Sequence, residues 1–282
     1  MRIISVAKKY TLPVWKYASR SLTRFFPESS IVVIVPDRDV RAFKRASPSE
    51  VLVEGESAYV SEFQALLQEK CGQINPARTG WYRQQLIKLE AMARFRAADP
   101  ELVIWDADAV PIRHFSFFGV EGDPLYLRGI KPVFDNGGNR YDLIHPPVSQ
   151  STQKILRLQT VVSHSWITQT FPIRSDWMSE FLGRIERIHG CSWWEAIVNS
   201  IDFSENSGFS EYETLGTFVS NEYPERVQYS PIDWELNGWQ VCGSPRRAAS
   251  KSGRKRVHSS LGLLGFEKWQ RPLPKNRSWS HR

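Results

Sequence analysis

Two short apolar segments, separated by helical patterns, constrain the fold most. Residues 31–35 form an uninterrupted β-branched run, and residues 102–105 form a second apolar run that ends at Asp106. Such short runs are typical of strands that are buried on both faces. Apolar residues at helical spacing cover 12–26 and 81–98. Strands that alternate with helices predict an α/β fold, Rossmann-like, with a mainly parallel sheet flanked by helices.

The rest of the chain adds weaker signals of the same two kinds. Beyond about residue 241 the sequence becomes rich in Ser, Arg and Lys, with one late apolar island at 261–269. We therefore expect a single domain over 1–242 and a basic C-terminal tail over 243–282. The further strands are expected over 2–7, 51–53, 124–128 and 160–168, and the further helices over 61–69, 177–188, 191–201 and 210–219.

The net charge of +7 is concentrated in the predicted tail. Residues 243–282 hold eleven Lys or Arg and one acid, Glu267, so the preceding 242 residues carry a net charge of −3. A body of that charge is not the broad cationic surface of a nucleic-acid-binding protein, and we expect no nucleic acid partner. The tail has two candidate roles, as a lid that folds over a bound diphosphate or as a peripheral contact with anionic lipid headgroups.

Aliphatic runs and cysteine spacing indicate in which cellular compartment the protein is expected. The longest purely aliphatic run, residues 31–35, is far shorter than the ~20 residues of a membrane-spanning helix. The three cysteines are widely spaced and give neither a zinc pattern nor a disulfide framework. We expect a cytoplasmic protein, with the inner face of the membrane as its one candidate contact.

Two carboxylates follow the apolar run at 102–105. Asp106 and Asp108 come where the chain must turn at the edge of the sheet, and at a bending strand end their side chains can converge on one ion. Hard carboxylate oxygens with open coordination positions suit Mn²⁺ or Mg²⁺ together with a diphosphate. Such an ion offsets the charge that develops on a departing phosphate. The pair therefore predicts a metal site.

Helix and strand lengths place a lysine beside these aspartates. The helix over 81–98 must run antiparallel to the next strand, and five strand residues at ~3.3 Å each cover the rise of roughly eleven helical residues. That distance ends near Lys88, which shares a helix face with Trp81 and Gln85. A cation and an amide at that level can hold a phosphate or sugar hydroxyls.

A third candidate segment begins at Ser210. The spacing of Ser210 and Glu213 is that of a capping box, in which the serine caps the helix and the glutamate folds back on the cap. Glu211 has no such structural duty. We expect Glu211 to orient a sugar hydroxyl or to remove its proton.

In three segments the chain resembles nucleotide-sugar-dependent glycosyltransferases of the GT-A type, which carry a DxD motif. It is most similar to a bacterial family of glycosyltransferase-like proteins that is still named as a domain of unknown function. The likeness covers most of residues 1–240. The matching segments are 80–89 (GWYRQQLIKL), 104–110 (IWDADAV) and 210–218 (SEYETLGTF).

The resemblance implies a GT-A-like fold and a transferase. The enzyme would move a sugar from a nucleoside diphosphate-sugar donor to a hydroxyl of a glycan or other acceptor, in bacterial surface glycan synthesis. Asp108 would hold Mn²⁺ or Mg²⁺ on the diphosphate, with Asp106 near the ribose or the ion. The implied contacts of the nucleotide base are Ala7, Lys9, Tyr10 and Asp37.

The resemblance also implies a late histidine as a third metal ligand. His258 precedes the segment 265–269 (GFEKW), which is similar to the Gly and Lys-Trp arrangement of one such family. The spacing is longer here, so His145 and His164 remain alternatives.

Two other classes of function stay open at this point. In a phosphatase of the haloacid dehalogenase type, Asp106 would attack phosphate as the nucleophile and Asp108 would act as acid and base. In a nucleic-acid-binding protein, the basic tail would supply the affinity.

Overall fold

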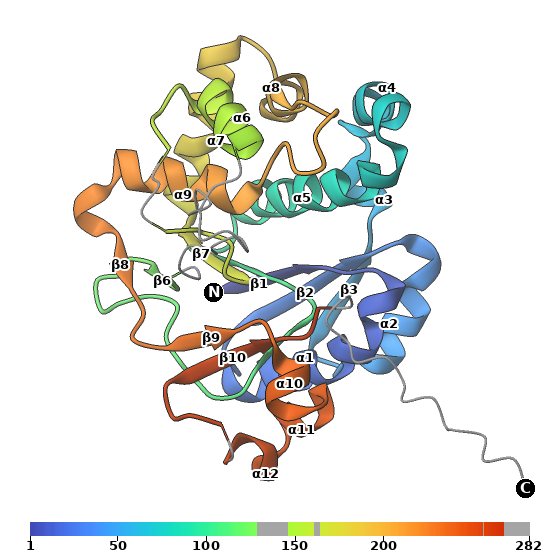
Figure 1. Cartoon of the computed structure of the whole chain (residues 1–282), viewed down its shortest axis with the longest axis vertical. Helices are drawn as coiled ribbons and strands as arrows, with labels where there is room; N and C mark the ends of the chain where they lie inside the picture. The colour runs from blue at the N-terminus through green and yellow to red at the C-terminus, as the bar shows by residue number, and fades with distance from the viewer. Residues whose placement is uncertain (129–145, 161–163, 256, 268–282) are drawn as a thin grey trace, which may run out of the picture.

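A five-stranded sheet lies at the centre of the molecule (Figure 1). A computed structural model of the chain describes residues 1–128, 146–160, 164–255 and 257–267. Four strands run parallel and the edge strand β7 runs antiparallel to β4, which confirms the expected α/β fold. In spatial order the strands are β3 (Val51–Gly55), β2 (Ser30–Val35), β1 (Arg2–Val6), β4 (Glu101–Trp105) and β7 (Thr170–Arg174).

The alternation of side chains along the strands produces two cores, one on each face of the sheet. Register pairs Ile4 with Val32 and with Ile104, and these three side chains are buried in one core. Their neighbours Ile3 and Val103 are buried in the other core. A strand whose successive residues enter two different cores is apolar throughout, which explains the continuous runs in the sequence.

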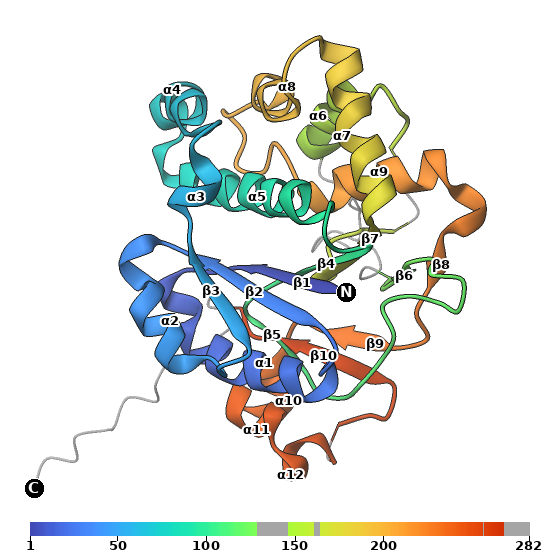
Figure 2. The ribbon, with the colours of Figure 1, turned by 180° about the vertical axis from the view of Figure 1, so that it is seen from behind.

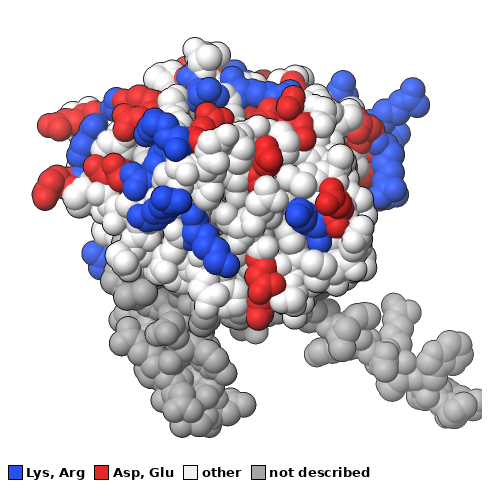
Figure 3. All heavy atoms as spheres, turned by 90° about the horizontal axis from the view of Figure 1, so that it is seen from above, with Lys and Arg blue, Asp and Glu red and all other residues white. Residues whose placement is uncertain are grey.

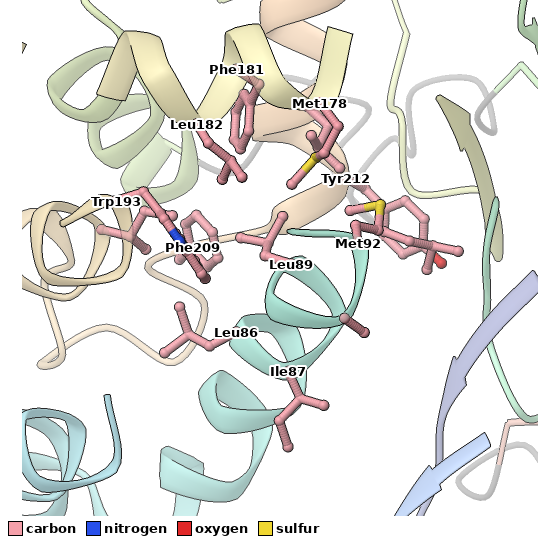
Figure 4. Close-up of a cluster of buried hydrophobic side chains, with 14 of the residues drawn as sticks. Leu86, Ile87, Leu89, Met92, Met178, Phe181, Leu182, Trp193, Phe209 and Tyr212 are labelled. Atoms are coloured by element: carbon pink, nitrogen blue, oxygen red, sulfur yellow. The ribbon is translucent and has the colours of Figure 1, made fainter. Parts of the chain in front are cut away.

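The first core lies under a thick layer of helices, seen from both sides in Figures 1 and 2. Leu89 of α5 points toward Met178 and Phe181 of α7, and Leu86 and Met92 of α5 belong to the same core (Figure 4). All five side chains are fully buried. The helices of this layer are α3 (Ser57–Val60), α4 (Gln64–Ile74), α5 (Pro76–Phe95), α6 (Pro146–Leu156), α7 (Ser175–His189), α8 (Trp193–Ser200) and α9 (Glu211–Glu222).

The second core lies between the sheet and α1 (Leu12–Phe25), with α2 (Val40–Ala46) and a second, three-stranded sheet beside it. Helix α1 begins with Pro13 in its first turn, and its buried side chains recur at helical spacing. The small sheet has the order β5 (Ala109–Pro111), β10 (Leu261–Gly265), β9 (Asp233–Glu235). The remaining elements are α10 (Gly238–Cys242), α11 (Pro245–Ala249), α12 (Lys251–Arg254), the pair β6 (Leu125–Tyr126) and β8 (Gln228–Tyr229), and the 3₁₀ turns 9–11, 37–39 and 224–226.

The strand expected over 160–168 is wrong for the residues described there. Residues 164–168 form a loop, and the strand β7 begins only at Thr170. The hydroxyl of Ser165 and the backbone N–H of Trp166 donate to the carboxylate of Glu213, so they do not pair with another strand. Pro172, which cannot donate a backbone hydrogen bond, is tolerated in β7 because that strand lies at the sheet edge.

The described part of the predicted basic tail is folded into the body, which corrects the boundary expected at residue 242. Strand β10 lies between β5 and β9, where Gly265 pairs with Ala109. Ala248 of α11 is fully buried in the second core. Residues 261–265 of the predicted apolar island form β10, and Leu263 and Leu264 fill part of the second core. Among the described residues, no helix has the length and apolar character needed to cross a membrane.

Candidate active site

A pocket of about 220 Å³ lies beyond the carboxyl ends of β1 and β4. In a parallel α/β sheet this edge is where ligands usually bind, because the connecting loops open there. Segments far apart in the sequence line the pocket. They are the ends of β1 and β4, one face of α5, the loop before β7, the first turn of α9, and the residue that follows Phe266.

A buried cluster of three charges forms one side of the pocket. The Nζ atom of Lys88 lies 2.6 Å from Oδ1 of Asp106 and 2.7 Å from Oε1 of Glu211. The side chains of Lys88 and Glu211 are 5% and 4% exposed, whereas Asp106 is 17% exposed. The structure therefore places Lys88 beside Asp106, as the helix and strand lengths predicted. However, two of the three donors of the ammonium already serve carboxylates, so at most one remains for the phosphate or the sugar hydroxyls that we expected Lys88 to hold.

The two carboxylates keep Lys88 charged. Burial alone lowers the pKa of a lysine, but the charges and hydrogen bonds of Asp106 and Glu211 outweigh it and raise the pKa of Lys88. For Glu211 burial is the largest influence and raises its pKa, while the charge of Lys88 opposes that rise. The ammonium also lies 4.7 Å from the centre of the Tyr212 ring. Lys88 thus neutralises charge inside the pocket wall and holds Asp106 and Glu211 in fixed positions.

Asp108 lines another part of the pocket wall, together with Glu267. Burial, the charge of Glu267 and the charge of Asp106 together raise the pKa of Asp108 to about 8. The pairing of β10 with β5 explains the proximity, because the backbone N–H of Phe266 donates to the carbonyl of Asp108 (2.8 Å). The charge of Glu267 therefore acts on Asp108, while the ammonium of Lys88 is bonded to Asp106 and Glu211.

Two amide side chains complete the pocket wall. Gln85 of α5 accepts a hydrogen bond from the backbone N–H of Glu211 through Oε1 (3.1 Å). Gln169 has a left-handed backbone with φ 68°, and its carbonyl accepts from the N–H of Asp106 (2.9 Å). Glutamine rarely adopts that backbone conformation, so the surrounding contacts must hold it there.

Two further pockets adjoin the first, and Tyr10 lines all three. One, of about 790 Å³, is lined by the predicted donor residues Lys9, Tyr10 and Asp37, and by charged side chains of both signs. The carboxylate of Asp37 accepts from the hydroxyl of Ser57 (2.7 Å), and Gly55 permits the approach because a Cβ there would meet Asp37. The lining residues of this pocket are Lys8, Lys9, Tyr10, Pro36, Asp37, Arg38, Asp39, Glu56 and Arg83.

The third pocket, of about 320 Å³, is largely apolar and lies between α1 and the first part of the predicted tail. Asp108 and Tyr10 connect it with the first pocket. Trp239 and Phe266 supply aromatic walls, and Arg246 is the basic side chain of the tail that reaches it among the described residues.

Two predicted residues lie outside these pockets. His258 sits in an exposed turn before β10, where its Nδ1 lies 2.8 Å from the hydroxyl of Ser260. His258 precedes β10, whereas Glu267 follows it at the end that lies beside Asp108. Glu267 therefore lines the pocket and His258 does not. Ala7 is buried in the second core and does not line a pocket either. Within the described residues no group of three or more His, Cys, Asp or Glu has the arrangement of a protein-only metal site.

His164, the alternative that lies among the described residues, does not line the pocket. His164 lies against Tyr229, with Nε2 2.9 Å from the tyrosine hydroxyl, and burial lowers its pKa. His145 lies outside the described residues.

The capping box at the start of α9 is half confirmed. The side chain of Ser210 accepts from the backbone N–H of Glu213 (3.3 Å), as expected of a cap. The carboxylate of Glu213 does not fold back on the cap but accepts from the hydroxyl of Ser165 (2.6 Å) and the N–H of Trp166 (3.1 Å). Burial raises the pKa of Glu213 to about 7. Glu213 therefore fastens to α9 the loop that leads to Gln169.

Glu267 and Gln169 are among the residues of the pocket wall that we did not predict. Glu267 stands inside the late GFEKW segment, so a signal for it was present, but we used that segment only for its Gly and Lys-Trp arrangement after His258. No sequence pattern pointed to Gln169, because the residues around it do not predict a left-handed backbone at a glutamine. The pocket nevertheless contains Trp81, Gln85, Lys88, Asp106, Asp108 and Glu211, all of which we expected near one another.

Comparison with known proteins gives a family match and similarity to solved structures. The model of DUF6492, a family of unknown function, matches residues 17–223, a range that contains Lys88, Asp106, Asp108 and Glu211. No curated protein matches the chain. Among solved structures, mouse xyloside xylosyltransferase 1 in its apo form is similar, with 11% sequence identity and a TM-score of 0.48, over 97% of this chain and 99% of that chain.

Proposed function

The chain belongs to DUF6492, a family of unknown function, and we propose that it is a glycosyltransferase that uses a nucleoside diphosphate-sugar donor. The transfer breaks the bond between the anomeric carbon of the sugar and the diphosphate and forms a bond to an acceptor hydroxyl. The acceptor proton leaves with the new bond, and the nucleoside diphosphate is released. The acceptor class, a bacterial surface glycan, rests on the sequence resemblance.

One observation carries the proposal: Asp106, Asp108 and Glu267 line one pocket, and the charges of the other two act on Asp108. A buried carboxylate beside a second one is unfavourable unless a positive charge accompanies it. The raised pKa of Asp108 expresses that imbalance. A divalent cation bound with a diphosphate would remove it and would bring the donor to this edge of the sheet.

The residues present fit such an ion. Carboxylate oxygens are the ligands that Mn²⁺ and Mg²⁺ prefer, and both ions readily complete their coordination with phosphate oxygens and water. Asp108 would hold the ion together with Glu267 or the outer oxygen of Asp106. When bound, the metal would supply Lewis-acid stabilisation of the departing diphosphate.

The remaining roles belong to the side chains. Lys88 and Glu211 fix Asp106 in place, and the burial of Glu211 against Lys88 favours a positioning role for Glu211 over the proton-accepting role that we expected. Tyr10, which is 52% exposed at the junction of the pockets, offers a ring to the nucleotide base. The pocket of about 790 Å³ beside it has room for the nucleoside.

Binding of the donor is the direct test. The purified chain is mixed with UDP-, GDP-, ADP- and dTDP-sugars, each with and without Mn²⁺, and the melting temperature and release of nucleoside diphosphate are measured. We expect at least one donor to raise the melting temperature only when Mn²⁺ is present. If no donor does so and none is hydrolysed, the proposal is wrong.

A matched pair of variants assigns the effect to the pocket. Asp108→Asn removes a carboxylate of the pocket, whereas Asp176→Asn makes the same chemical change at an exposed residue of α7 that pairs with Arg174. We expect the first variant to lose the Mn²⁺-dependent shift and the second to keep it. Equal loss in both variants would contradict the proposed site.

The same preparations decide between the proposal and its two rivals. Hydrolysis of an aryl phosphate that is lost in Asp106→Asn would support a phosphatase. Salt-dependent binding of DNA or RNA would support a nucleic-acid-binding protein, but on the face drawn in Figure 3 basic and acidic side chains are interspersed and form no continuous cationic surface.

A further inference from the structure

Among the described residues, three that line the pocket of about 220 Å³ have a buried polar atom without a hydrogen-bond partner. One is the hydroxyl of Tyr212, which lies beside Asp106, and the other two are Nε2 of Gln85 and Oε1 of Gln169. Gln85 and Gln169 are only 3% exposed. A buried polar atom left without a partner costs about 1–3 kcal/mol, so such atoms are rare unless a ligand completes them.

Oε1 of Gln85 accepts from the N–H of Glu211, which fixes this amide and leaves the donor group Nε2 for a ligand. The backbone carbonyl of Gln169 bonds to Asp106, and the side chain of this left-handed residue presents an unpaired Oε1. The two amides therefore offer one free donor and one free acceptor. A sugar hydroxyl can accept from the first and donate to the second.

The charge of the pocket limits the ligand further. Among the described residues, four carboxylates line it, those of Asp106, Asp108, Glu211 and Glu267, together with the ammonium of Lys88. Even with one divalent cation, these five side chains carry a net charge of −1. A sugar that carries a carboxylate would place another negative charge there, at a distance where like charges repel strongly.

We propose that this pocket binds the transferred sugar of the donor, that Gln85 and Gln169 hold its hydroxyls, and that the acidic wall selects an uncharged sugar over a uronic acid. The inference rests on the proposed function and adds the class of sugar to it. The pocket is smaller than the ~300–1,000 Å³ of sites for drug-sized ligands, which fits a single monosaccharide with its nucleotide outside.

Matched donors test the selection. Dissociation constants are measured by calorimetry with Mn²⁺ for UDP-glucose against UDP-glucuronate and for UDP-galactose against UDP-galacturonate, with UDP alone as the reference. We expect the uncharged member of at least one pair to bind about tenfold or more tightly than its uronate. Equal or tighter binding of the uronates overturns the inference but leaves the proposed function in place. If neither UDP nor any of these sugars binds, the inference is overturned, and the donor panel above decides the proposed function separately.

Variants of the amides test the contacts. Gln169→Leu removes the unpaired acceptor, and we expect about a 5- to 10-fold loss in affinity for the UDP-sugar with little change for UDP, as for one hydrogen bond. Gln64→Leu is the control, because its Oε1 is also buried without a partner but the residue does not line this pocket. A Gln169→Leu variant that loses affinity for UDP and UDP-sugar equally would make the residue structural and contradict the assignment.

The second amide has a conservative variant. Gln85→Glu keeps an oxygen for the N–H of Glu211 but removes the free donor. We expect a larger loss for the UDP-sugar than for UDP. An unchanged ratio of the two dissociation constants would exclude Gln85 from sugar binding.

Discussion

The two sides of the pocket contain the same kind of side chain in opposite electrostatic settings. Asp106 and Glu211 share the buried ammonium of Lys88, whereas burial and the charge of Glu267 raise the pKa of Asp108 to about 8. The first side is charge-compensated by Lys88. On the second side, a bound cation would favour the ionised form of Asp108. Carboxylates of one pocket can therefore belong either to the scaffold or to the ligand site, and the position of one lysine decides which.

Replacement of Lys88 should give the largest effect. Lys88→Met leaves two buried carboxylates without their cation, and loss of one partner of such a buried pair destabilises by about 3–5 kcal/mol. Urea denaturation measures the difference. The control Lys70→Met changes an exposed lysine of α4 and should stay within about 0.5 kcal/mol of the native protein. Similar stabilities of the two variants would show that the first side is not compensated by Lys88.

Replacement of Asp108 should affect function and not stability. Asp108→Asn removes one of two opposed acids, so without metal we expect unchanged or higher stability. With Mn²⁺ and donor we expect transfer or donor hydrolysis to fall about 100-fold, because several kcal/mol of charge stabilisation are lost. Thermal melts and product release measure the two effects. A variant that is less stable without metal and as active as the native protein would reverse the comparison between the two sides.

Glu213 extends the comparison to a buried carboxylate that has no cation. Its pKa of about 7 lies above the 4.5 of an ordinary glutamate, so the folded chain takes up a proton more readily than the unfolded chain. Stability should therefore decline as the pH rises from about 5 to 8, by about 2–3 kcal/mol from this residue. Glu213→Gln should reduce that decline while keeping an acceptor for Ser165 and Trp166. Equal pH dependence in both proteins would show that Glu213 is not desolvated.

A surface ion pair should give the smallest loss of stability among these variants. Glu222 and Arg184 form an ion pair at 2.9 Å with side chains that are 35% and 25% exposed. Glu222→Gln should cost less than about 1 kcal/mol, and the loss should shrink at high salt. A cost as large as that of Lys88→Met would mean that burial does not govern these pairs.

The first half of the molecule could be predicted because its order is local and repetitive. The run 102–105 is apolar throughout since both faces of β4 are buried, and regular rises per residue placed Lys88 beside Asp106. The sharing of Lys88 between Asp106 and Glu211 could not be predicted. It depends on where α9 packs, which no spacing in the sequence records.

The rest of the site depends on irregular backbone and long-range pairing. Gln169 owes its place to a left-handed turn, and Glu267 owes its place to β10. The basic composition of 243–282 suggested a separate tail, although Leu263 and Leu264 fill the second core. Composition averaged over forty residues hid a five-residue strand. Residues that act in such a site have to be found in three dimensions.

The pairing of β10 with β5 has a consequence for the order of events during synthesis. Residues 109–111 leave the ribosome about 150 residues before 263–265, so the N-terminal sheet can form long before Glu267 reaches Asp108. During that interval the nascent chain has an incomplete pocket and cannot bind donor in the proposed way. Under the proposed function, the chain would thus become competent only after Glu267 has been translated.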